Sequence, residues 1–430
     1  MQGEVLSPIL FSLYVNDIES SFLRENCPSI DIHRINIFLL MYADDMVLLS
    51  ESIEGLQKML NTSSNYTKEW DLNVNVQKTK IMIFRNGSTV KDNEKWYFND
   101  ILLDIVNEFN YLGILMCYNG KFLKTQKHVA DQGRKALFAI NNSLKNHCFN
   151  VETKCSVFDM YVGSVLTYGS EIWGFHKAPD VEKVHINFCK NVLGVNRKTC
   201  NNVVYCELGR LPLYVKRKLR IFKYWVKLRN TDNCILKACY EDMSTYSNTW
   251  LNNIKVELSN LGLNYLFNHS RNQDTYRIIK NRVIDTYRQN IMASIENSSK
   301  CSMYRHLVDN FCMQYYLTKP LDTYCKQLIT RYRTSSHSLY IERGRHNNVP
   351  RNMRICNHCS LNDIEDEFHF VLKCPLYKDL RKRYIKQFYY VKPSVFKLIK
   401  LLSVHNVSEL SNLGNYLKYA TQLRKESVDI

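Results

Sequence analysis

The sequence predicts an α+β fold that becomes mainly helical along the chain, and three observations lead to this prediction. Short apolar runs alternate with helical patterns up to about residue 121. Helix-like spacing of apolar residues then dominates up to residue 330, and the chain as a whole has few residues that interrupt helices, with 14 Gly and 8 Pro in 430. A Cys/His cluster marks a small C-terminal domain. We therefore expect four successive domains, over 1–121, 122–235, 236–330 and 331–430.

The segment Tyr42-Ala43-Asp44-Asp45 follows a helix predicted within residues 1–24 and lies between the apolar runs 37–41 and 46–49. Such runs predict two buried strands joined by a tight turn, with walls that exclude water. Two adjacent carboxylates at the tip are costly unless a positive partner balances them. A pair of divalent metal ions would do so, and oxygen ligands suit Mg²⁺ or Mn²⁺. The hairpin therefore indicates a site for phosphoryl transfer.

The other elements of the first domain are an amphipathic helix and several short strands. Apolar residues at helical spacing predict the helix over 53–70. A short strand is predicted over 80–84. Asn99-Asp100 is a plausible hairpin turn between two apolar triplets. Residues 109–116 close this α+β domain.

Composition limits the partners and the compartment of the protein. The net charge of +17 and the pI near 9.1 favour RNA or DNA as a partner, and a generally basic composition without such a partner is the alternative. The 15 Cys lack regular spacing and no secretory signal begins the chain, which favours a reducing compartment. No charge-free apolar stretch reaches transmembrane length. We therefore expect an intracellular protein that does not enter a membrane.

Two basic segments are candidate nucleic-acid-binding surfaces. Residues 216–220 carry dense positive charge on a predicted helix that also bears aromatic residues, which fits either nucleic-acid binding or a solvated face. Residues 331–354 are predicted to be a basic loop in which Glu342 is the only acid, and such a loop can contact phosphates. The candidate residues are Lys216, Arg217, Arg331, Arg333, Arg343 and Arg345.

The pattern Cys356-x2-Cys359-x9-His369-x4-Cys374 is typical of a tetrahedral zinc site. Its four ligands leave no open position, so we expect one structural Zn²⁺. His358 is a possible substitute ligand. The alternative interpretation is a set of reduced cysteines that happen to lie near a histidine.

Four successive blocks resemble the later palm motifs of a non-LTR (LINE-type) retrotransposon reverse transcriptase. The blocks are Gln2–Phe11 with Asn16–Ile18, Tyr42–Asp45, Trp70–Asn75 with Lys78–Lys80, and Phe109–Gly113. Residues 168–173 and 207–212 are similar to segments found downstream of such palms. The resemblance implies a partial palm of antiparallel strands with two packed helices. A helical thumb and connector and a zinc-bearing C-terminal region would follow.

The resemblance also implies roles for individual residues and a family activity, RNA-directed DNA synthesis with Mg²⁺ or Mn²⁺ on RNA and DNA in the nucleus. Lys80 is an alternative to Lys78 beside the pyrophosphate, and both could instead be surface lysines. The implied residues are Asp44, Asp45 and Lys78 for catalysis, Gln2, Gly3 and Tyr42 for template and nucleotide, and Tyr111, Leu112 and Gly113 for the primer grip.

The sequence departs from the family pattern at its start. Family members carry a first catalytic Asp and fingers strands ahead of the motif that begins here at Gln2-Gly3. Loss of one metal-holding carboxylate costs orders of magnitude in rate, so we expect a reverse transcriptase fragment without independent activity. One alternative is a nonenzymatic nucleic-acid-binding protein that uses its basic thumb and its zinc-bearing C-terminus. Another is an unstable relic, because a partial sheet exposes strand edges and apolar surface.

Overall fold

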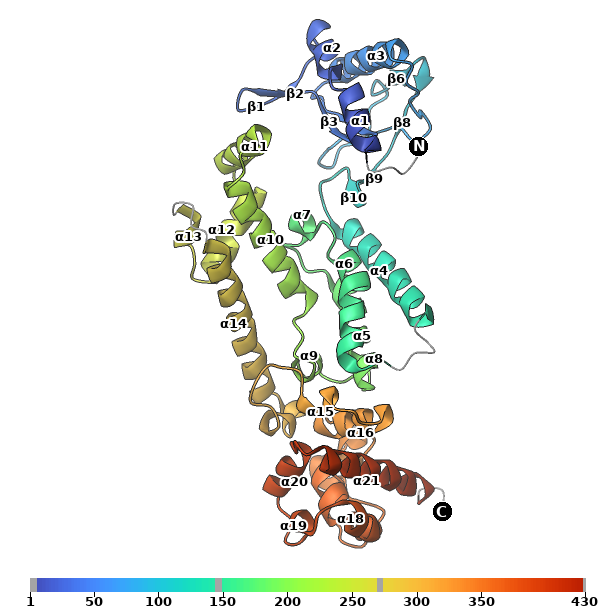
Figure 1. The fold of residues 1–430 in the computed structure, drawn as a ribbon, viewed down its shortest axis with the longest axis vertical. Coiled ribbons are helices and arrows are strands. Elements are labelled where there is room, and N and C mark those ends of the chain that lie inside the picture. The colour runs from blue at the N-terminus through green and yellow to red at the C-terminus, as the bar shows by residue number, and fades with distance from the viewer. Residues whose placement is uncertain (1–5, 144–148, 269–273, 428–430) are drawn as a thin grey trace. The chain divides into compact units, whose positions relative to one another are not determined.

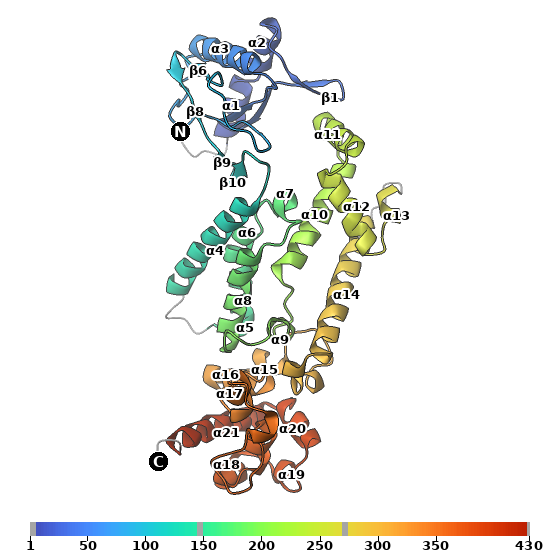
Figure 2. The same cartoon turned by 180° about the vertical axis from the view of Figure 1, so that it is seen from behind.

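The computed structural model describes residues 6–143, 149–268 and 274–427, which fall into two compact units (Figure 1, Figure 2). The first unit comprises Met1–His128, Glu171–Phe175 and Arg220–Arg277. The second comprises Val129–Ser170, His176–Leu219 and Ile278–Ile430. The chain passes between the units within helices α4 (Leu123–Ser143), α7 (Ser170–Trp173), α10 (Leu213–Arg229) and α14 (Thr275–Glu296), and once more between Phe175 and His176.

The N-terminal part of the first unit has a hydrophobic core between helices and short strands. Helix α3 (Ile53–Glu69) is capped by the Ser52 hydroxyl, which accepts a hydrogen bond from the Gly55 N–H. The rings of Phe22 and Phe38 stack in this core with their centroids 5.9 Å apart. The helix predicted over 53–70 is therefore confirmed. The helices that precede it are α1 (Ser7–Tyr14) and α2 (Ile18–Arg24).

The described strands pair two by two, and no larger sheet forms among them. All pairs are antiparallel except β5 with β8, which is parallel. Two-residue turns close several hairpins, including the predicted turn at Asn99-Asp100, where both residues have positive φ. The strands are β1 (Ile30–Ile32), β2 (Ile35–Ile37), β3 (Leu39–Tyr42), β4 (Asp45–Leu48), β5 (Lys80–Ile81), β6 (Tyr97–Phe98), β7 (Ile101–Leu102), β8 (Asp104–Ile105), β9 (Glu108–Tyr111) and β10 (Ile114–Cys117).

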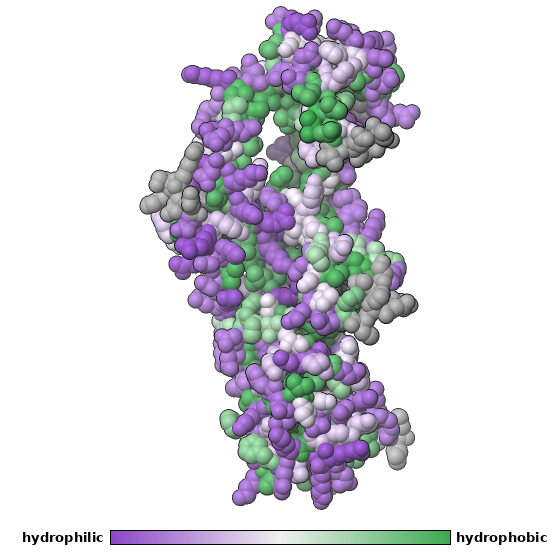
Figure 3. Space-filling view, viewed as in Figure 1, coloured by the Kyte–Doolittle hydropathy of each residue, from purple (hydrophilic) through white to green (hydrophobic). Residues whose placement is uncertain are grey.

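Helix α1 presents apolar side chains to solvent. Four leucine and isoleucine residues at its start and along it are more than half exposed, up to 67% for Leu13, whereas Phe11 packs against the core. Figure 3 shows a hydrophobic patch over this helix. A contiguous apolar patch on a folded surface commonly marks a contact with another protein segment. The exposed residues are Leu6, Ile9, Leu10 and Leu13.

The rest of both units is helical, as the sequence predicts for residues 122–330. In the first unit the further helices are α11 (Cys234–Thr245), α12 (Trp250–Asn260) and α13 (Tyr265–Asn268). In the second unit the segments up to residue 318 are α5 (Val151–Val157), η1 (Phe158–Gly163), α6 (Ser164–Leu166), α8 (Pro179–Leu193), α9 (Asn201–Glu207), η2 (Ser299–Cys301), η3 (Tyr304–His306) and α15 (Tyr315–Thr318).

The C-terminal part of the second unit is a helical assembly in which α16 and α18 both pack on α21. The prediction that residues 331–354 form a loop is wrong for much of that segment, because α16 extends to Arg333 and α17 occupies Tyr340–His346. The helices are α16 (Thr323–Arg333), α17 (Tyr340–His346), η4 (Arg351–Met353), η5 (His369–Lys373), η6 (Pro375–Tyr377), α18 (Lys378–Tyr384), α19 (Gln387–Tyr390), α20 (Val395–Leu402) and α21 (Val407–Glu426). None of the helices in the described ranges has the length and apolar character of a membrane span.

Candidate functional site

The hairpin β3–β4 carries the two adjacent carboxylates at its tip. Tyr42 pairs with Asp45, so Ala43 and Asp44 form a two-residue turn. Ala43 has a φ of 54°, a conformation that costs a non-glycine residue about 1–2 kcal/mol. Backbone strain of this kind is often retained at functional sites. The predicted hairpin is therefore present, with strain concentrated next to Asp44.

The tip of this hairpin is open to solvent. Asp44 and Asp45 are exposed, and Tyr42 is 66% exposed. The prediction that both strands are buried and exclude water is wrong, because β3 and β4 pair only with each other and alternate residues face outward. Leu40 and Met46 are exposed, whereas Leu39, Met41 and Leu48 pack against the core.

The predicted primer-grip residues lie at and beside the turn that joins β9 to β10. Leu112 and Gly113 occupy that turn with φ values of 48° and 78°. Burial raises the pKa of Tyr111, and the nearby Asp45 carboxylate raises it further. The fold thus brings Tyr111 close to the carboxylate hairpin, although 66 residues separate it from Asp45 in the sequence.

The two lysines proposed for the leaving group have different surroundings. Lys80 lies on β5, and its ammonium binds the Asp104 carboxylate at 2.6 Å on the parallel partner β8. Lys78 is exposed in the turn before β5, where its backbone N–H donates to the Asn75 side chain. The ion pair engages Lys80 and favours Lys78 as the available cation. Gln2 and Gly3, predicted at the template and nucleotide site, lie outside the described residues.

The four predicted zinc ligands converge in the second unit. Their ligand atoms, from Cys356, Cys359, His369 and Cys374, all lie within 4.8 Å of one another. Zn–S bonds of about 2.3 Å place the ligand atoms of a tetrahedral site about 4 Å apart. The four ligand atoms would therefore have to move closer together by about 1 Å or less to coordinate one zinc ion. The cluster could therefore hold a zinc ion. Among the described residues, it is the one group of three or more such ligands close enough to share a metal.

A π turn brings His369 and Cys374 to the same side of their helix. In an α-helix a spacing of five residues leaves two side chains about 140° apart. Here η5 is a π-helix, and the Cys374 N–H donates to the His369 carbonyl, five residues earlier, at 2.8 Å. Tyr416 on α21 donates to the carbonyl oxygens of Phe370 and Val371 within this wider turn. Single π turns are frequent at functional sites.

Two groups lie beside the His369 ring nitrogens, although Nδ1 makes no hydrogen bond with the described residues. The Nε2 of the ring lies 3.4 Å from the Cys359 Sγ, and its Nδ1 lies 3.5 Å from an Asp363 carboxylate oxygen. A carboxylate behind a ligating histidine commonly fixes its tautomer. His358 is not part of the cluster, because its Nδ1 lies 2.9 Å from the Ser427 hydroxyl. Sequence reasoning missed Asp363, whose spacing from His369 carries no known signature.

A short antiparallel bridge closes the loop that holds the two cysteines of the Cys-x2-Cys pair. Ile355 pairs with Ile364, so the intervening loop contains both cysteines. Next to this bridge, Glu365 is buried and binds Arg424 of α21 through contacts of 2.5 and 2.8 Å. The cluster is therefore fixed to the C-terminal helix by a buried ion pair.

The basic run on α10 is not a free phosphate-binding surface. Arg217 is 1% exposed and binds Glu182 at 2.9 Å. Lys216 is half-buried and binds Asp159 at 2.8 Å. The nucleic-acid contact predicted for Arg217 is therefore contradicted by its burial, and Lys216 already has a carboxylate partner.

Arg333 also has a structural role that its sequence context does not reveal. It is 2% exposed, and its guanidinium binds the fully buried Glu207 at 2.7 Å and the Leu402 carbonyl at 2.7 Å. The Tyr304 and Tyr316 hydroxyls also donate to Glu207. This burial contradicts the nucleic-acid contact predicted for Arg333. Sequence reasoning missed Glu207 as the centre of a buried network, because its partner lies 126 residues away.

The other predicted arginines differ in exposure. Arg331 is half-buried and donates to the Gly194 carbonyl at 2.7 Å. Arg345 is half-buried and binds Glu342. Arg343 is exposed on α17. The structure therefore leaves Arg343 as the exposed member of the set predicted in residues 331–354.

Comparisons with known proteins connect the N-terminal part to one family. Residues 1–116 match the family described as reverse transcriptase (RNA-dependent DNA polymerase). The chain is 27% identical over 197 residues to a probable RNA-directed DNA polymerase from transposon BS of Drosophila melanogaster, covering 43% of this chain and 21% of the relative. It is 22% identical over 241 residues to the RNA-directed DNA polymerase from mobile element jockey of the same organism, covering 53% and 24%.

A further relative is a putative uncharacterized transposon-derived protein, F52C9.6, of Caenorhabditis elegans. It is 31% identical over 170 residues, which cover 37% of this chain and 58% of the relative. The chain thus spans less than two thirds of each of these relatives. Residues 1–116 thus match the reverse transcriptase family, and the N-terminal part of the chain is similar to the polymerases of non-LTR retrotransposons.

Proposed function

We propose that residues 1–121 are the later part of a reverse transcriptase palm, in which Asp44 and Asp45 hold Mg²⁺ or Mn²⁺. The observation that supports this most directly is the strained two-residue turn at Ala43, which presents both carboxylates. Divalent metals bound there would neutralise phosphate charge and align the reacting oxygens during nucleotide addition. Tyr111 lies near Asp45, as expected of a primer grip beside the metals.

The remaining palm residues receive roles by their position. The exposed Tyr42 would pack against the nucleotide, and the exposed Lys78 would neutralise the pyrophosphate. Leu112 and Gly113 would let the backbone of their turn approach the primer. Gln2 and Gly3 would line the template and nucleotide pocket.

Metal binding tests the palm proposal directly. Mn²⁺ binding, followed by electron paramagnetic resonance, should be weakened at least tenfold in a variant that combines Asp44→Asn with Asp45→Asn. Asp92→Asn is the matched control, because Asp92 is an exposed carboxylate in the same part of the first unit. Equal Mn²⁺ binding by the double variant and the control would refute the proposed role of the hairpin.

We also propose that the chain of 430 residues does not extend a primer by itself. The support is chemical: within the described residues, Asp44 and Asp45 have no third carboxylate, His or Cys grouped with them as a metal ligand. Two-metal phosphoryl transfer depends on ligands that hold both ions. Primer extension on an RNA template with Mg²⁺ and dNTPs should give no product. If the wild-type chain gives a product and the Asp44→Ala variant does not, the proposed inactivity of the chain is wrong and the proposed metal-binding role of Asp44 is supported.

The rest of the chain would serve as a helical thumb (122–235), a connector (236–330) and a zinc-bearing domain (331–430). RNA and DNA in the nucleus are the proposed partners, and one structural Zn²⁺ is the proposed cofactor of the last domain. The buried positions of Cys356, His369 and Cys374 support a structural role for that metal.

A nonenzymatic nucleic-acid-binding function is the second candidate, supported by the net charge of +17 and the exposed Arg343. Affinity for RNA and DNA should fall steeply as salt rises, and Arg343→Gln should reduce the salt slope by about 1. Arg331→Gln is the comparison, because the Gly194 carbonyl already engages that guanidinium. A flat salt dependence of the wild-type chain would contradict this candidate.

A further inference from the structure

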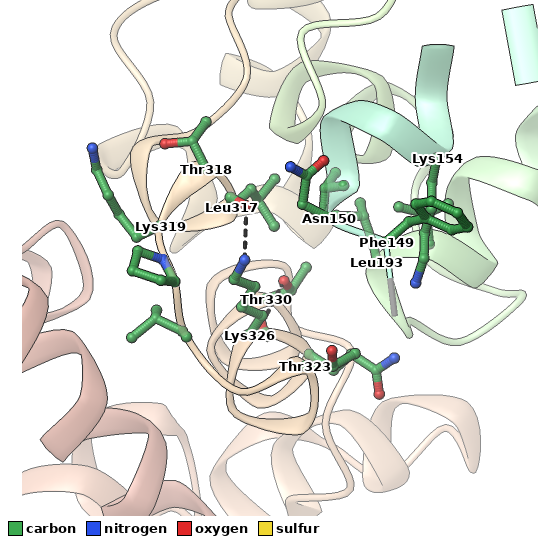
Figure 4. A pocket seen from close by; sticks show the side chains of 15 residues that line it. Phe149, Asn150, Lys154, Leu193, Leu317, Thr318, Lys319, Thr323, Lys326 and Thr330 are labelled. Atoms are coloured by element: carbon green, nitrogen blue, oxygen red, sulfur yellow. Dashed lines mark hydrogen bonds between the residues drawn. The ribbon is translucent and has the colours of Figure 1, made fainter. Parts of the chain in front are cut away.

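The positive charge of the second unit gathers in places that differ in their surroundings. Figure 4 shows a cavity of about 360 Å³ between the start of α5, the end of α8 and the segment that joins α15 to α16. The lysines of this cavity do not converge, because Lys154 and Lys326 lie apart and the Lys326 Nζ donates to the Leu317 carbonyl at 3.1 Å. The helices α19 and α20, in contrast, direct two lysines to one exposed aromatic ring.

Two ammonium groups of α20 lie against the ring of Phe388 on α19. The Nζ atoms of Lys397 and Lys400 are 4.9 Å and 5.1 Å from the centroid of this ring, within the range of a cation–π interaction. The two lysines are three residues apart on α20, so their side chains leave the same face of the helix. The Lys397 Nζ also donates to the Val391 carbonyl at 2.6 Å, which holds it beside the ring. The ring and both cations therefore form one local arrangement.

The core anchors both helices and leaves aromatic rings at the surface. Three leucines of α20 are buried, and on α19 the buried Tyr389 donates its hydroxyl to Glu409 at 3.2 Å. Phe388 is nevertheless 52% exposed and Phe396 is 69% exposed. Large apolar side chains that anchored helices hold in water are typical of a surface that binds a partner.

The chain around these rings is strongly basic. Residues 380–408 contain seven Lys and Arg and no Asp or Glu. Two of the seven are engaged within the fold, because Arg381 is buried against the Cys374 carbonyl and Lys386 binds Glu409 at 2.6 Å. A polyanion is therefore the partner that complements this charge. The other five basic residues are exposed or half-buried, namely Lys382, Arg383, Lys392, Lys397 and Lys400.

Rings and cations together favour a single-stranded nucleic acid over other polyanions. Each nucleotide of an unpaired strand offers a phosphate to a lysine and a flat base that can stack on an aromatic ring. A duplex presents its phosphates but keeps its bases stacked on one another, and an acidic peptide offers carboxylates without such a base. An anionic membrane surface would also bind both lysine and phenylalanine side chains. The match of residues 1–116 to the reverse transcriptase family favours the nucleic acid.

We propose that Phe388, Phe396, Lys397 and Lys400 form an aromatic–lysine surface that binds single-stranded RNA or DNA. Bases stack on the two rings, and the two lysines bind the phosphates. This inference rests on the nucleic-acid-binding function proposed above and specifies the form of the strand. It involves neither Arg343 nor the hairpin carboxylates, so it can fail while those proposals stand.

Fluorescence anisotropy of the full chain with labelled oligo(dT), alone and annealed to oligo(dA), tests this surface. Combining Phe388→Ala with Phe396→Ala should weaken binding of the single strand by about tenfold, because its bases lose their stacking partners. Affinity for the duplex should change by less than about twofold, since both lysines remain. Phe138→Ala is the matched control, because Phe138 on α4 is also 69% exposed, and it should bind both forms like the wild type. Oligo(U) tests RNA in the same way.

The substitution Phe388→Trp reports on the ring itself. It keeps an aromatic side chain, so the affinity for oligo(dT) should be preserved. The fluorescence of the introduced indole should also be quenched by oligo(dT), because a base stacks on it, and this signal should exceed any change in the wild-type tryptophans. A purely structural role of Phe388 would give no such quenching.

The proposal is overturned if the double alanine variant binds oligo(dT) like the wild type. Salt-dependent binding by the wild-type chain would then still support the general nucleic-acid function, whereas its absence would refute both. Vesicles of phosphatidylserine and phosphatidylcholine test the membrane as partner. If the double alanine variant loses binding to these vesicles but keeps its affinity for oligo(dT), the surface belongs to a membrane contact and the proposal is wrong.

Discussion

The carboxylate hairpin and the Cys/His cluster are both candidate metal sites, but they differ in how many ligands they bring together and in how deeply those ligands are buried. The cluster brings four ligands within 4.8 Å, buries most of them and backs His369 with Asp363. The hairpin offers Asp44 and Asp45 on an exposed turn of a two-stranded sheet, with no third ligand grouped beside them in the described residues. A structural metal site can be complete within 19 residues of sequence, whereas a catalytic one needs ligands and walls from several elements.

The two sites should therefore differ in what they contribute to stability. A metal at the cluster would join the loop that carries Cys356 and Cys359 to η5, so its loss should unfold the residues around the cluster. A metal at the hairpin would add charge balance to an exposed turn, and its loss should leave the fold unchanged. Of the three predictions below, the first and the last test this contrast, and the second measures a buried ion pair for comparison.

The largest effect is expected from removal of the zinc ligands. Structural zinc contributes about 10–16 kcal/mol of apparent binding free energy in small zinc-binding peptides, so Cys356→Ser with Cys359→Ser should unfold residues around the cluster. Metal analysis should give about one Zn per wild-type chain and none in the variant, and limited proteolysis should cleave the variant near α17 and η5.

His358→Ala is the control for this experiment, because His358 hydrogen-bonds Ser427 and lies outside the ligand group. It should keep its zinc and its resistance to proteolysis. A wild-type chain that is fully folded without metal, even after chelation, would show that the cluster is only a set of packed cysteines.

A smaller effect is expected from the buried pair Arg333–Glu207. Arg333→Leu leaves the Glu207 carboxylate without its cationic partner in the protein interior, which costs about 3–5 kcal/mol of unfolding free energy. Arg343→Leu, at an exposed position of α17, should cost under about 0.5 kcal/mol. Chemical denaturation of both variants measures the difference. Similar values for the two would contradict the structural role assigned to Arg333.

The smallest effect on stability is expected at the hairpin. Asp44→Asn and Asp45→Asn remove neighbouring like charges from an exposed turn, so each should change the unfolding free energy by under about 0.5 kcal/mol. Thermal unfolding with and without Mg²⁺ measures this. A loss of several kcal/mol in either variant would mean that the hairpin carboxylates stabilise the fold, and the contrast with the cluster would fail.

Local pattern was sufficient to predict the hairpin and the helix α3. The apolar runs on either side of Asp44 and Asp45 predict the positions of both strands and of their turn. This works because the pairing of two strands across a two-residue turn involves only residues that are neighbours in the sequence. The exposure of the same strands could not be predicted. It depends on whether another strand pairs with β3 or β4, and none does among the described residues.

The Cys/His spacing also predicted the four residues that converge in a cluster able to hold a metal, although it gave no sign of the π turn that brings His369 and Cys374 together. The basic segments were less predictable. Arg217, Lys216 and Arg333 look alike in the sequence, as positive charges without a local acid.

The sequence by itself therefore determined where the two candidate metal sites lie and which residues form them, because both depend on short-range spacing. Only the tertiary structure decided which charges remain free for a partner. The carboxylates that neutralise Arg217, Lys216 and Arg333 lie 35, 57 and 126 residues away in the chain. Electrostatic partners are chosen by distance in space and by burial, and neither can be read from neighbouring residues.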